Sequence, residues 1–451
     1  MFDFGPVAAQ NDPNILLYFH TTGQVAALVL PDATPHDFVF VARPGAGKTA
    51  LVKWLEGEDH ARTMLSISPT RTRLLMDEDE ANVEDYRIMM RAELFTAVVV
   101  EAIQRGLVAG SLARTCKAYY TKQWLKSVGK SLSDKFEGMS ILGNGFSLQQ
   151  SERRDYLREI RANGKVEIAS KLVTQLAQQV PLTVIVDDPE SLVTQGLEDM
   201  TPENAIRIGA FLSVLCQLHL LGVQVMVFAR EFIVQGVQRY YKDFSHFGAR
   251  IGALEWTGDD LLDVVRLRLE NRLEMNWQDV FTMSEATFAD LVLPCLLNGP
   301  RDLVQICNTA GKAEKRISKA MLARAIRGLA TKKWQEIDSH YSAQWPAIGL
   351  FAKTACDVIS GRFKSRPVAR DKIRSAIEKD FQTSGRPLNK LREREDWMYT
   401  ALWDTPSIEE RLFIIGCLGY VHDKSEVYPW AGRSLDGFQV ADSLFLTPLF
   451  S

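Results

Sequence analysis

The chain has 451 residues, of which 46% are hydrophobic and 24% charged, a composition that excludes global disorder and collagen-like architecture. At roughly 100–200 residues per domain, this length predicts two to four domains. The formal net charge is −3, from 53 basic and 56 acidic residues, which excludes a protein-wide positive field for nucleic acid or membranes. Binding of either kind would need a local site.

The sequence carries no pattern of a membrane or secreted protein. It has no run of about 18 uncharged apolar residues, and acidic and amide side chains stand where a signal peptide would be basic and then apolar. We therefore expect a cytoplasmic protein with no membrane partner. Its six cysteines form no C-x-x-C pair, so we expect buried thiols rather than a zinc ribbon, and the seven histidines show no metal-ligand spacing.

The first strongly patterned stretch has the order strand, loop, helix. The apolar run 37–41 is followed by a glycine-containing loop at 42–49 and by helical spacing of apolar residues at 50–55. The loop reads ARPGAGKT, which matches the Walker A pattern except that Ala42 replaces the first glycine. The alternative is a chance match of the motif, but the strand before the loop and the helix after it favour a phosphate-binding loop.

Each part of this loop has a chemical role in holding Mg-ATP. Gly45 and Gly47 let backbone N–H groups curl around phosphate oxygens, Lys48 reaches the β- and γ-phosphates, and the Thr49 hydroxyl ligates Mg²⁺. We expect Lys48 to be catalytic as well. The expected nucleotide-binding residues are Pro44, Gly45, Ala46, Gly47, Lys48, Thr49 and Ala50.

Further apolar runs predict the rest of an α/β core. The runs 182–186 and 223–228 are nearly continuous in apolar residues, helical spacing separates them at 204–221, and 250–256 supplies a last strand. Such strands, buried on both faces and alternating with helices, are typical of a parallel sheet covered by helices. We therefore predict an α/β P-loop NTPase core.

Acidic residues follow the second of these strands. Asp187 stands where a Walker B aspartate holds the Mg²⁺ ion, and we assign it to the metal site together with Thr49. Asp188 follows at the position of a catalytic base and is one methylene shorter than the glutamate usual there, with Glu190 two residues on. The alternative for Asp188 or Glu190 is that the side chain only caps the next helix.

Two arginines are candidate sensors of the γ-phosphate. Arg230 follows the third apolar run, and its alternative is a surface arginine beside Glu231. Arg301 follows Gly299-Pro300 at the start of a predicted helix, from which it could swing onto the γ-phosphate and couple the nucleotide to lid position. The alternative for Gly299-Pro300 is a loop breaker before a helix, and both interpretations can hold together.

The patterns divide the chain into three predicted domains. Residues 1–256 form the ATPase core with a helical insertion at about 82–175, residues 257–345 form an all-helical lid, and residues 346–451 form a winged-helix-like domain. Within the last, we expect a helix at 408–418 and two short strands at 419–422 and 437–440.

In combination, the strings ARPGAGKT, TVIVDD, VMVFARE and NGPRDL resemble the AAA+/STAND group of ATPases, especially its origin-recognition-like members. The opening Phe4-Gly5 with Asn11-Asp12, residues 307–310 and residues 337–342 look like a bacterial P-loop ATPase family sometimes called FunZ-type. The resemblance spans about residues 1–350. It implies an ATPase found in bacterial conflict loci beside nucleases or other effectors, and the changes at Ala42 and Asp188 put fast hydrolysis in doubt.

A local basic segment precedes the expected winged helix. Residues 361–397 hold eleven Lys/Arg and six Asp/Glu, a net of +5. A basic helix beside a wing, with Arg370 and Arg374 among its arginines, is one way to read duplex DNA. The alternative, slightly favoured by the overall charge, is a solvated helix face whose basic side chains pair with Asp371, Glu378 and Asp380.

The sequence thus supports two functions. The first is an ATP-hydrolysing switch, a homo-oligomer or a protein that controls an effector partner, with antiphage defence as its setting; Arg239 and Arg250 are then candidates for an arginine supplied to a neighbouring subunit. The second is a nucleotide-gated DNA-binding or scaffold protein that holds ATP and scarcely hydrolyses it.

Overall fold

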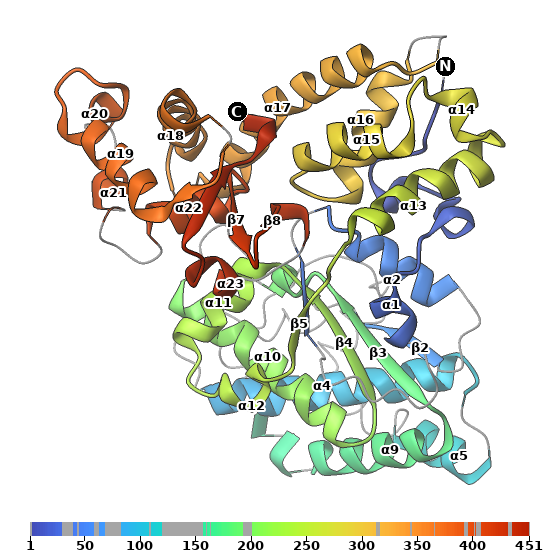
Figure 1. The fold of residues 1–451 in the computed structure, drawn as a ribbon. Coiled ribbons are helices and arrows are strands. Elements are labelled where there is room, and N and C mark those ends of the chain that lie inside the picture. The colour runs from blue at the N-terminus through green and yellow to red at the C-terminus, as the bar shows by residue number, and fades with distance from the viewer. Residues whose placement is uncertain are drawn as a thin grey trace. The chain divides into compact units, whose positions relative to one another are not determined.

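A computed structural model describes most of the chain, and its contacts divide the chain into two compact units (Figure 1). The sheet unit contains Gly23–Val41 and Val52–Gly252, and the lid unit contains Met1–Thr22, Ala42–Leu51 and Ala253–Ser451. The described residues are 2–28, 39–42, 45–57, 63–67, 83–107, 110–119, 157–158, 160–162, 164–192, 201–312, 316–342, 345–364, 366–391, 396–400, 402, 407–431 and 435–450.

A five-stranded sheet is the centre of the sheet unit. Its order is β2 (Thr63–Ser66), β3 (Leu182–Asp187), β4 (Gln224–Ala229), β1 (Val39–Val41) and β5 (Ile251–Ala253). β2 pairs with β3, β3 with β4 and β4 with β1, each time in parallel. The predicted parallel sheet is therefore confirmed, while β2 is a strand that the sequence patterns did not indicate.

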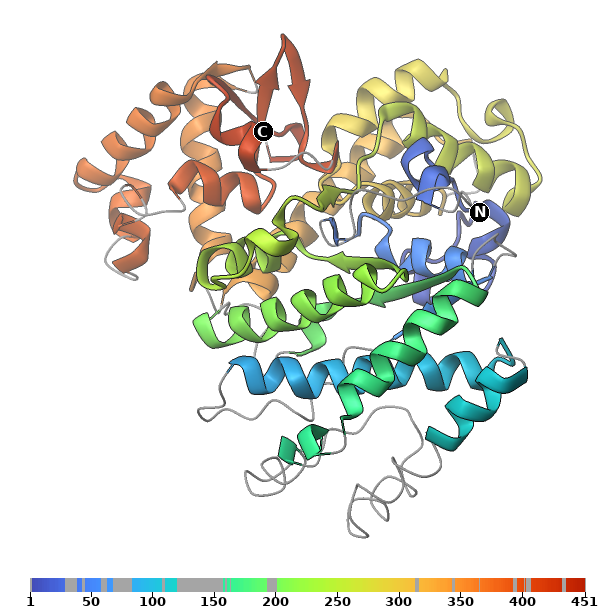
Figure 2. The same ribbon diagram turned by 90° about the horizontal axis from the view of Figure 1, so that it is seen from below.

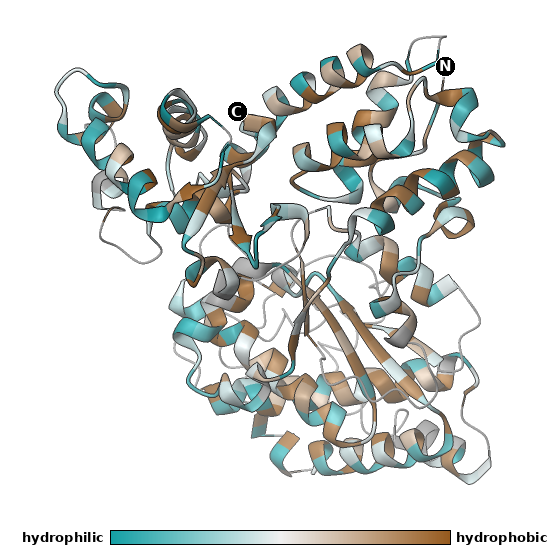
Figure 3. Ribbon diagram, viewed as in Figure 1, coloured by the Kyte–Doolittle hydropathy of each residue, from teal (hydrophilic) through white to brown (hydrophobic). Residues whose placement is uncertain are grey.

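Helices cover this sheet because its central strands are apolar on both faces. Every residue of β4 is buried, as is β3 up to Val186, and both strands are mainly hydrophobic in Figure 3. Their side chains share one core with the surrounding helices, and α4 packs on both α9 and α10 (Figure 2). These helices are α4 (Val83–Gln104), α5 (Gly110–Tyr119), α9 (Lys165–Gln179), α10 (Pro202–Leu220), α11 (Glu231–Tyr240) and α12 (Ser245–Gly248).

The predicted helical insertion corresponds to three of these helices. α4, α5 and α9 lie between β2 and β3 in the chain. The buried face of α4 is lined by apolar residues at helical spacing, among them Met90, Leu94 and Val98. Residues 120–156 of the insertion lie outside the described residues.

The lid begins at a well-capped helix and contains mainly helices. Thr257 and Asp260 form a capping box at the start of α13, in which each side chain accepts from the other residue's main-chain N–H. The lid elements are α13 (Gly258–Arg268), a π-helical turn at Leu269–Leu273, α14 (Trp277–Val280), α15 (Glu285–Val292), α16 (Pro300–Ala310) and α17 (Lys319–Tyr341).

The amino-terminal segment packs on this lid. Main-chain N–H of Phe4 donates to Asn308 Oδ1 at 2.7 Å, and Asn308 Nδ2 donates to the carbonyl of Gly5 at 2.7 Å. The fully enclosed Tyr18 ring lies 4.6 Å from the guanidinium carbon of Arg268. Two segments of the sequence that share the family resemblance, 4–5 and 307–310, are thus in contact.

The carboxy-terminal part of the lid unit combines helices with a small sheet, as a winged helix does. Its sheet has the order β6 (Val368–Ala369), β9 (Ser443–Leu446), β7 (Leu418–His422) and β8 (Ser425–Val427), with antiparallel pairs. The helices are α18 (Ile348–Phe363), α19 (Arg370–Gln382), α20 (Pro387–Leu391), α21 (Asp396–Thr400), α22 (Ile408–Ile414) and α23 (Leu435–Gln439). Together with the core and the lid, this confirms the predicted fold class.

One predicted strand of this part is wrong. Residues 437–440 were expected as a strand, but α23 covers Leu435–Gln439 and the last strand lies further on, at β9. The Phe438 ring stacks on Phe413 with centroids 4.3 Å apart, while Val440 is 76% exposed. Only one apolar side chain of this run faces the core, which suits a single helical turn better than a strand.

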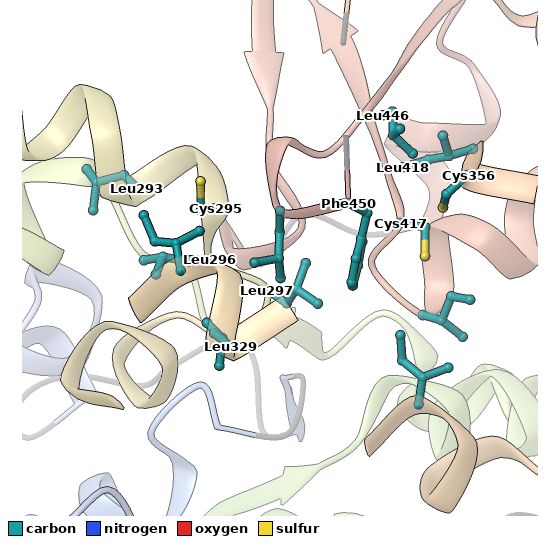
Figure 4. Close-up of a cluster of buried hydrophobic side chains, with 14 of the residues drawn as sticks. Leu293, Cys295, Leu296, Leu297, Leu329, Cys356, Cys417, Leu418, Leu446 and Phe450 are labelled. Carbon is teal, nitrogen blue, oxygen red and sulfur yellow. The ribbon is translucent and has the colours of Figure 1, made fainter. Parts of the chain in front are cut away.

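A continuous apolar core links the lid to the carboxy-terminal part (Figure 4). Leu293, Leu296 and Leu297 of the lid belong to the same buried cluster as Phe450, whose ring centroid lies 4.2 Å from that of Trp334. The boundary predicted at residue 345 therefore crosses shared packing, and both predicted domain boundaries remain predictions.

The cysteines behave as small buried hydrophobic residues. Five of them are free and buried, and the side chain of Cys116 lies outside the described residues. Burial raises the pKa of the Cys295 thiol to about 11 and that of Cys307 to about 12. Among the described helices, none is long and apolar enough to span a bilayer.

Candidate nucleotide site

The predicted phosphate loop connects β1 to α2 (Lys48–Gly57), as the sequence order indicated. Gly45 and Gly47 have φ values of +85° and +95°, a backbone region in which a side chain is strained. Ala42 is outside that region and buried, so this position does not require glycine. Pro44, also expected to bind nucleotide, lies outside the described residues together with Arg43.

The two residues of the loop that bear reactive side chains begin α2. Lys48 Nζ donates to the carbonyl of Ala42 at 2.9 Å, so this side chain folds back over the loop. Thr49 and Ala50 follow in the first turn, where the partial positive charge of the helix terminus favours an anion. Lys48 and Thr49 thus directly follow the two positive-φ glycines, and their contacts with a nucleotide remain predictions.

Two segments that are distant in sequence pack against the backbone of this loop, the one between β5 and α13 and the turn that starts α16. The Trp256 indole Nε1–H donates to the carbonyl of Ala46 at 2.9 Å, and the main-chain N–H of Arg301 lies 3.4 Å from the carbonyl oxygen of Gly45. A Cβ at Gly45 would lie 2.9 Å from Asn298 Cβ and 3.0 Å from Arg301 Cβ. Gly45 is therefore required twice, by its φ angle and by the approach of the lid.

Arg301 is thus brought to the phosphate loop, whereas its role as a sensor stays a prediction. It is the second residue of α16, which begins at Pro300 after Gly299 in a positive-φ conformation. Its Cδ lies 3.1 Å from the position that a Cβ of Gly45 would take. Both interpretations of Gly299-Pro300 agree with this geometry, because the pair breaks the loop and starts the helix that carries Arg301.

A buried ion pair that the sequence analysis missed supports this turn. Asp302 Oδ2 accepts the main-chain N–H groups of Leu297 and Asn298, both at 2.9 Å. Asp302 Oδ1 lies 2.8 Å from Lys333 Nζ on α17, and the side chains are 0% and 2% exposed. Asp302 directly follows Arg301 in the string NGPRDL and could have been recognised there. No sequence spacing indicated that Lys333 would be its partner.

The candidate carboxylates and Arg230 lie at the carboxyl edge of the sheet. Asp187 is the last residue of β3, and the register pairs it with Phe228 on β4, which pairs in turn with Phe40 on β1. Arg230 directly follows β4 as the residue before α11. Asp187 and Arg230 thus lie at the carboxyl ends of two neighbouring strands, and their roles toward a metal ion and a nucleotide remain predictions.

Asp188 has an unusual backbone conformation. Its φ is +57°, in the left-handed region, and the residue is exposed. Its main-chain carbonyl accepts the N–H of Ser191 at 3.0 Å. The side chain of Glu190 lies outside the described residues, so the choice between catalysis and capping is not decided for either residue.

The oxygen donors predicted for the metal suit Mg²⁺. Thr49 offers a hydroxyl and Asp187 a carboxylate, the hard donors that Mg²⁺ prefers, and Mg²⁺ takes its remaining ligands from substrate phosphates and water. Among the described residues, no group of three His, Cys, Asp or Glu side chains could hold a metal ion without further ligands. The residues present therefore fit Mg-ATP.

Two arginines of the basic segment are engaged within the protein. Arg374 Nε and one terminal nitrogen donate to the two carboxylate oxygens of Glu409 at 2.7 and 3.0 Å, and the Glu409 side chain is 0% exposed. Arg370 donates to the main-chain carbonyls of Phe438 and Ala441. Their expected partners Asp371, Glu378 and Asp380 are thus not the ones found, and both arginines support the fold of this part.

Other basic side chains of the same segment face solvent. Seven are exposed, and within the described part of the chain the structure gives none of them an ion pair. They are Arg362, Lys364, Arg366, Lys372, Lys379, Arg386 and Lys390.

Solved structures that are similar to this chain include two ATPase-related proteins. A Walker-type ATPase of Pyrococcus abyssi has 13% identity and a TM-score of 0.40, and the match covers 92% of this chain and 97% of that one. The Orc1 protein of Aeropyrum pernix, solved in complex with DNA, has 12% identity and a TM-score of 0.34, with 94% and 86% covered. No family model and no curated protein matches the chain.

Proposed function

We propose that the chain is a Mg-dependent ATPase that acts as a molecular switch. The observation that carries the proposal is the loop between β1 and α2, in which Gly45 and Gly47 adopt positive φ directly before Lys48 and Thr49. Such a loop turns several main-chain N–H groups toward one point and binds phosphate there.

Phosphoryl transfer to water needs mainly positioning and neutralisation of charge. In the proposed site, Lys48 and the loop N–H groups bind the phosphates, and Thr49 and Asp187 hold Mg²⁺. The metal ion, when bound, neutralises charge on the phosphates. Asp188 accepts a proton from the attacking water, and Arg230 and Arg301 stabilise the charge that develops on the transferred group.

The lid contacts support a switch rather than a simple hydrolase. Arg301 belongs to the lid helix α16, and its main chain already contacts Gly45 of the phosphate loop. If its side chain binds the γ-phosphate, the same residue links the nucleotide to the lid. Nucleotide at the loop would then fix the lid and the carboxy-terminal part in a form that binds a partner, either an effector protein or further copies of this chain. A role in bacterial antiphage defence and a cytoplasmic location belong to this proposal through the family resemblance and the sequence composition.

Replacing the loop lysine tests the proposal. We expect Lys48→Ala to lower Mg-ATP turnover by about 10²–10³-fold, because a positioned charge on the phosphates is lost. Lys53→Ala is the matched control, since it removes the same side chain from the same helix outside the loop. Steady-state phosphate release and equilibrium binding of Mg-ATP measure the effect. Equal affinity and turnover in Lys48→Ala and the unmodified chain would contradict the assignment.

A second candidate function is a nucleotide-gated DNA-binding or scaffold protein with little hydrolysis. The seven exposed basic side chains of the carboxy-terminal part favour it, since phosphate contacts dominate affinity for nucleic acid. Asp188 in place of glutamate agrees with slow hydrolysis. Retention of ATP with turnover no higher than that of Lys48→Ala would favour this candidate over the ATPase.

A further inference from the structure

We propose that Trp256 is a positioning residue of the phosphate loop. By donating a hydrogen bond to a loop carbonyl, it turns the neighbouring main-chain N–H group toward the phosphates. This inference rests on the proposed function and adds to it a residue outside the Walker motifs. Trp256 belongs to the segment between β5 and α13 and is half-buried.

Two donors from this part of the chain reach successive carbonyls of the loop. Trp256 Nε1–H donates to the Ala46 carbonyl at 2.9 Å, and Arg301 N–H approaches the Gly45 carbonyl at 3.4 Å. The first contact has good hydrogen-bond length, and the second is at the long limit. Trp256 is therefore the stronger of the two attachments.

Peptide planarity gives these contacts a consequence on the other side of the loop. In a trans peptide the C=O of one residue and the N–H of the next point in opposite directions. Because the Ala46 carbonyl points to Trp256, the N–H of Gly47 points away from it, and in the same way the N–H of Ala46 points away from Arg301. Successive N–H groups that face one side of a turn form a concave site for an anion.

Two glycines lie beside the indole ring, at distances where a Cβ would be in ordinary van der Waals contact with it. A Cβ at Gly47 would lie 3.4 Å from the Trp256 ring carbon Cζ2, and one at Gly299 would lie 3.8 Å from Cδ1. The ring thus occupies the space between the phosphate loop and the turn that starts α16. The Trp256 contact and phosphate binding would therefore stabilise each other. The coupling free energy is the same in both directions.

The test removes the indole N–H and keeps an aromatic ring. For Trp256→Phe we expect the Kd to rise by about 3–10-fold for both Mg-ATP and inorganic pyrophosphate, the loss of one net hydrogen bond. Trp277→Phe is the matched control, because Trp277 Nε1 also donates to a main-chain carbonyl, that of Met283 at 2.8 Å, away from the loop. Trp256→His returns a ring N–H and should recover part of the affinity.

Indole N–H resonances provide a readout that a merely structural role would not move. The nine tryptophans give at most nine such signals in the ¹⁵N-labelled full chain, and the Trp256→Phe spectrum identifies the one that is lost. We expect that signal to shift when pyrophosphate is added, because the anion polarises the peptide to which the indole donates. The Trp277 signal should stay in place.

The outcomes separate the two proposals. Unchanged affinity in Trp256→Phe, with binding abolished by Lys48→Ala, would overturn the positioning role and leave the ATP site standing. Pyrophosphate binding that Trp256→Phe weakens, without any ATP turnover, would support the positioning role and contradict the ATPase. An unmodified chain that binds neither ligand would overturn both.

Discussion

Asp188 has a backbone conformation that costs free energy, and it lies next to a candidate metal ligand. A left-handed φ costs a non-glycine residue about 1–2 kcal/mol, although Asp and Asn bear it better than most. Strained backbone of this kind often occurs at functional sites, where it fixes the direction of a side chain. Here it occurs directly after Asp187, at the carboxyl edge of the sheet.

Replacing this aspartate separates its charge from its conformation. We expect Asp188→Asn to keep Mg-ATP affinity and stability, because asparagine tolerates the same φ, and to lower turnover by about 10²-fold, because the amide is no base. Asp188→Gly should lose turnover as well, yet keep or raise the unfolding temperature. Single-turnover hydrolysis and thermal unfolding measure these effects. Normal turnover in Asp188→Asn would leave Asp188 no catalytic role.

Sequence and structure agree best for residues whose roles are local. Gly45 and Gly47 were recognised because the loop motif specifies their positions, and Asp187 because a buried strand ends there. Trp256 and Lys333 were missed because each acts through a contact with a segment distant in sequence, which spacing does not reveal. Tryptophan and lysine also occur at many positions of the sequence, so neither residue type by itself indicates a functional contact.

At the scale of elements, the pair of Asp302 and Lys333 joins α16 to α17 beneath the turn that contacts Gly45. Both charges are buried, so removing one of them leaves the other without a partner of opposite charge. Loss of one partner of a buried pair typically lowers the free energy of unfolding by about 3–5 kcal/mol. Asp302 also holds two main-chain N–H groups of the turn, so loss of the pair would disturb the loop contact as well as the helices.

Removing the lysine charge tests this role. We expect Lys333→Met to lower the free energy of unfolding by about 3–5 kcal/mol, with Asp302 left buried and unpaired. Lys332→Met is the control, because its side chain is exposed one residue away on the same helix, and it should change stability by less than about 0.5 kcal/mol. Urea unfolding followed by circular dichroism compares them. Equal midpoints would mean that the ion pair does not stabilise the lid.

Elements with strong periodicity were predictable and short ones were not. The buried strands β3 and β4 and the helix α10 lie within a few residues of the expected ranges, because long apolar runs and 3.6-residue spacing are unambiguous. The four-residue β2 was missed, and α23 was expected as a strand. A few residues carry too little pattern to distinguish a strand from a helical turn, so tertiary contacts such as Phe438 on Phe413 decide.

For the whole molecule, the net charge of −3 hides a marked local asymmetry. The segment 361–397 has a net charge of +5, and those of its basic side chains that the structure describes fall into two groups. Arg370 and Arg374 are held by carbonyls and by Glu409, so changing them would damage the fold rather than report on a ligand. The exposed side chains of the segment are therefore the ones with which DNA binding should be tested.

Neutral variants of exposed lysines on α19 test the second candidate function. Lys372 and Lys379 are seven residues apart and therefore share one helix face. If the chain binds duplex DNA, Lys372→Gln with Lys379→Gln should weaken binding alike for unrelated sequences and reduce the slope of log K against log salt by about 2. Lys319→Gln with Lys332→Gln makes the same charge change on exposed residues of α17 and should leave the slope unchanged. Fluorescence anisotropy with a labelled duplex over a salt series measures both. Equal slopes for the two double variants would place any DNA contact elsewhere, and no binding by the unmodified chain at low salt would remove DNA from the candidate partners.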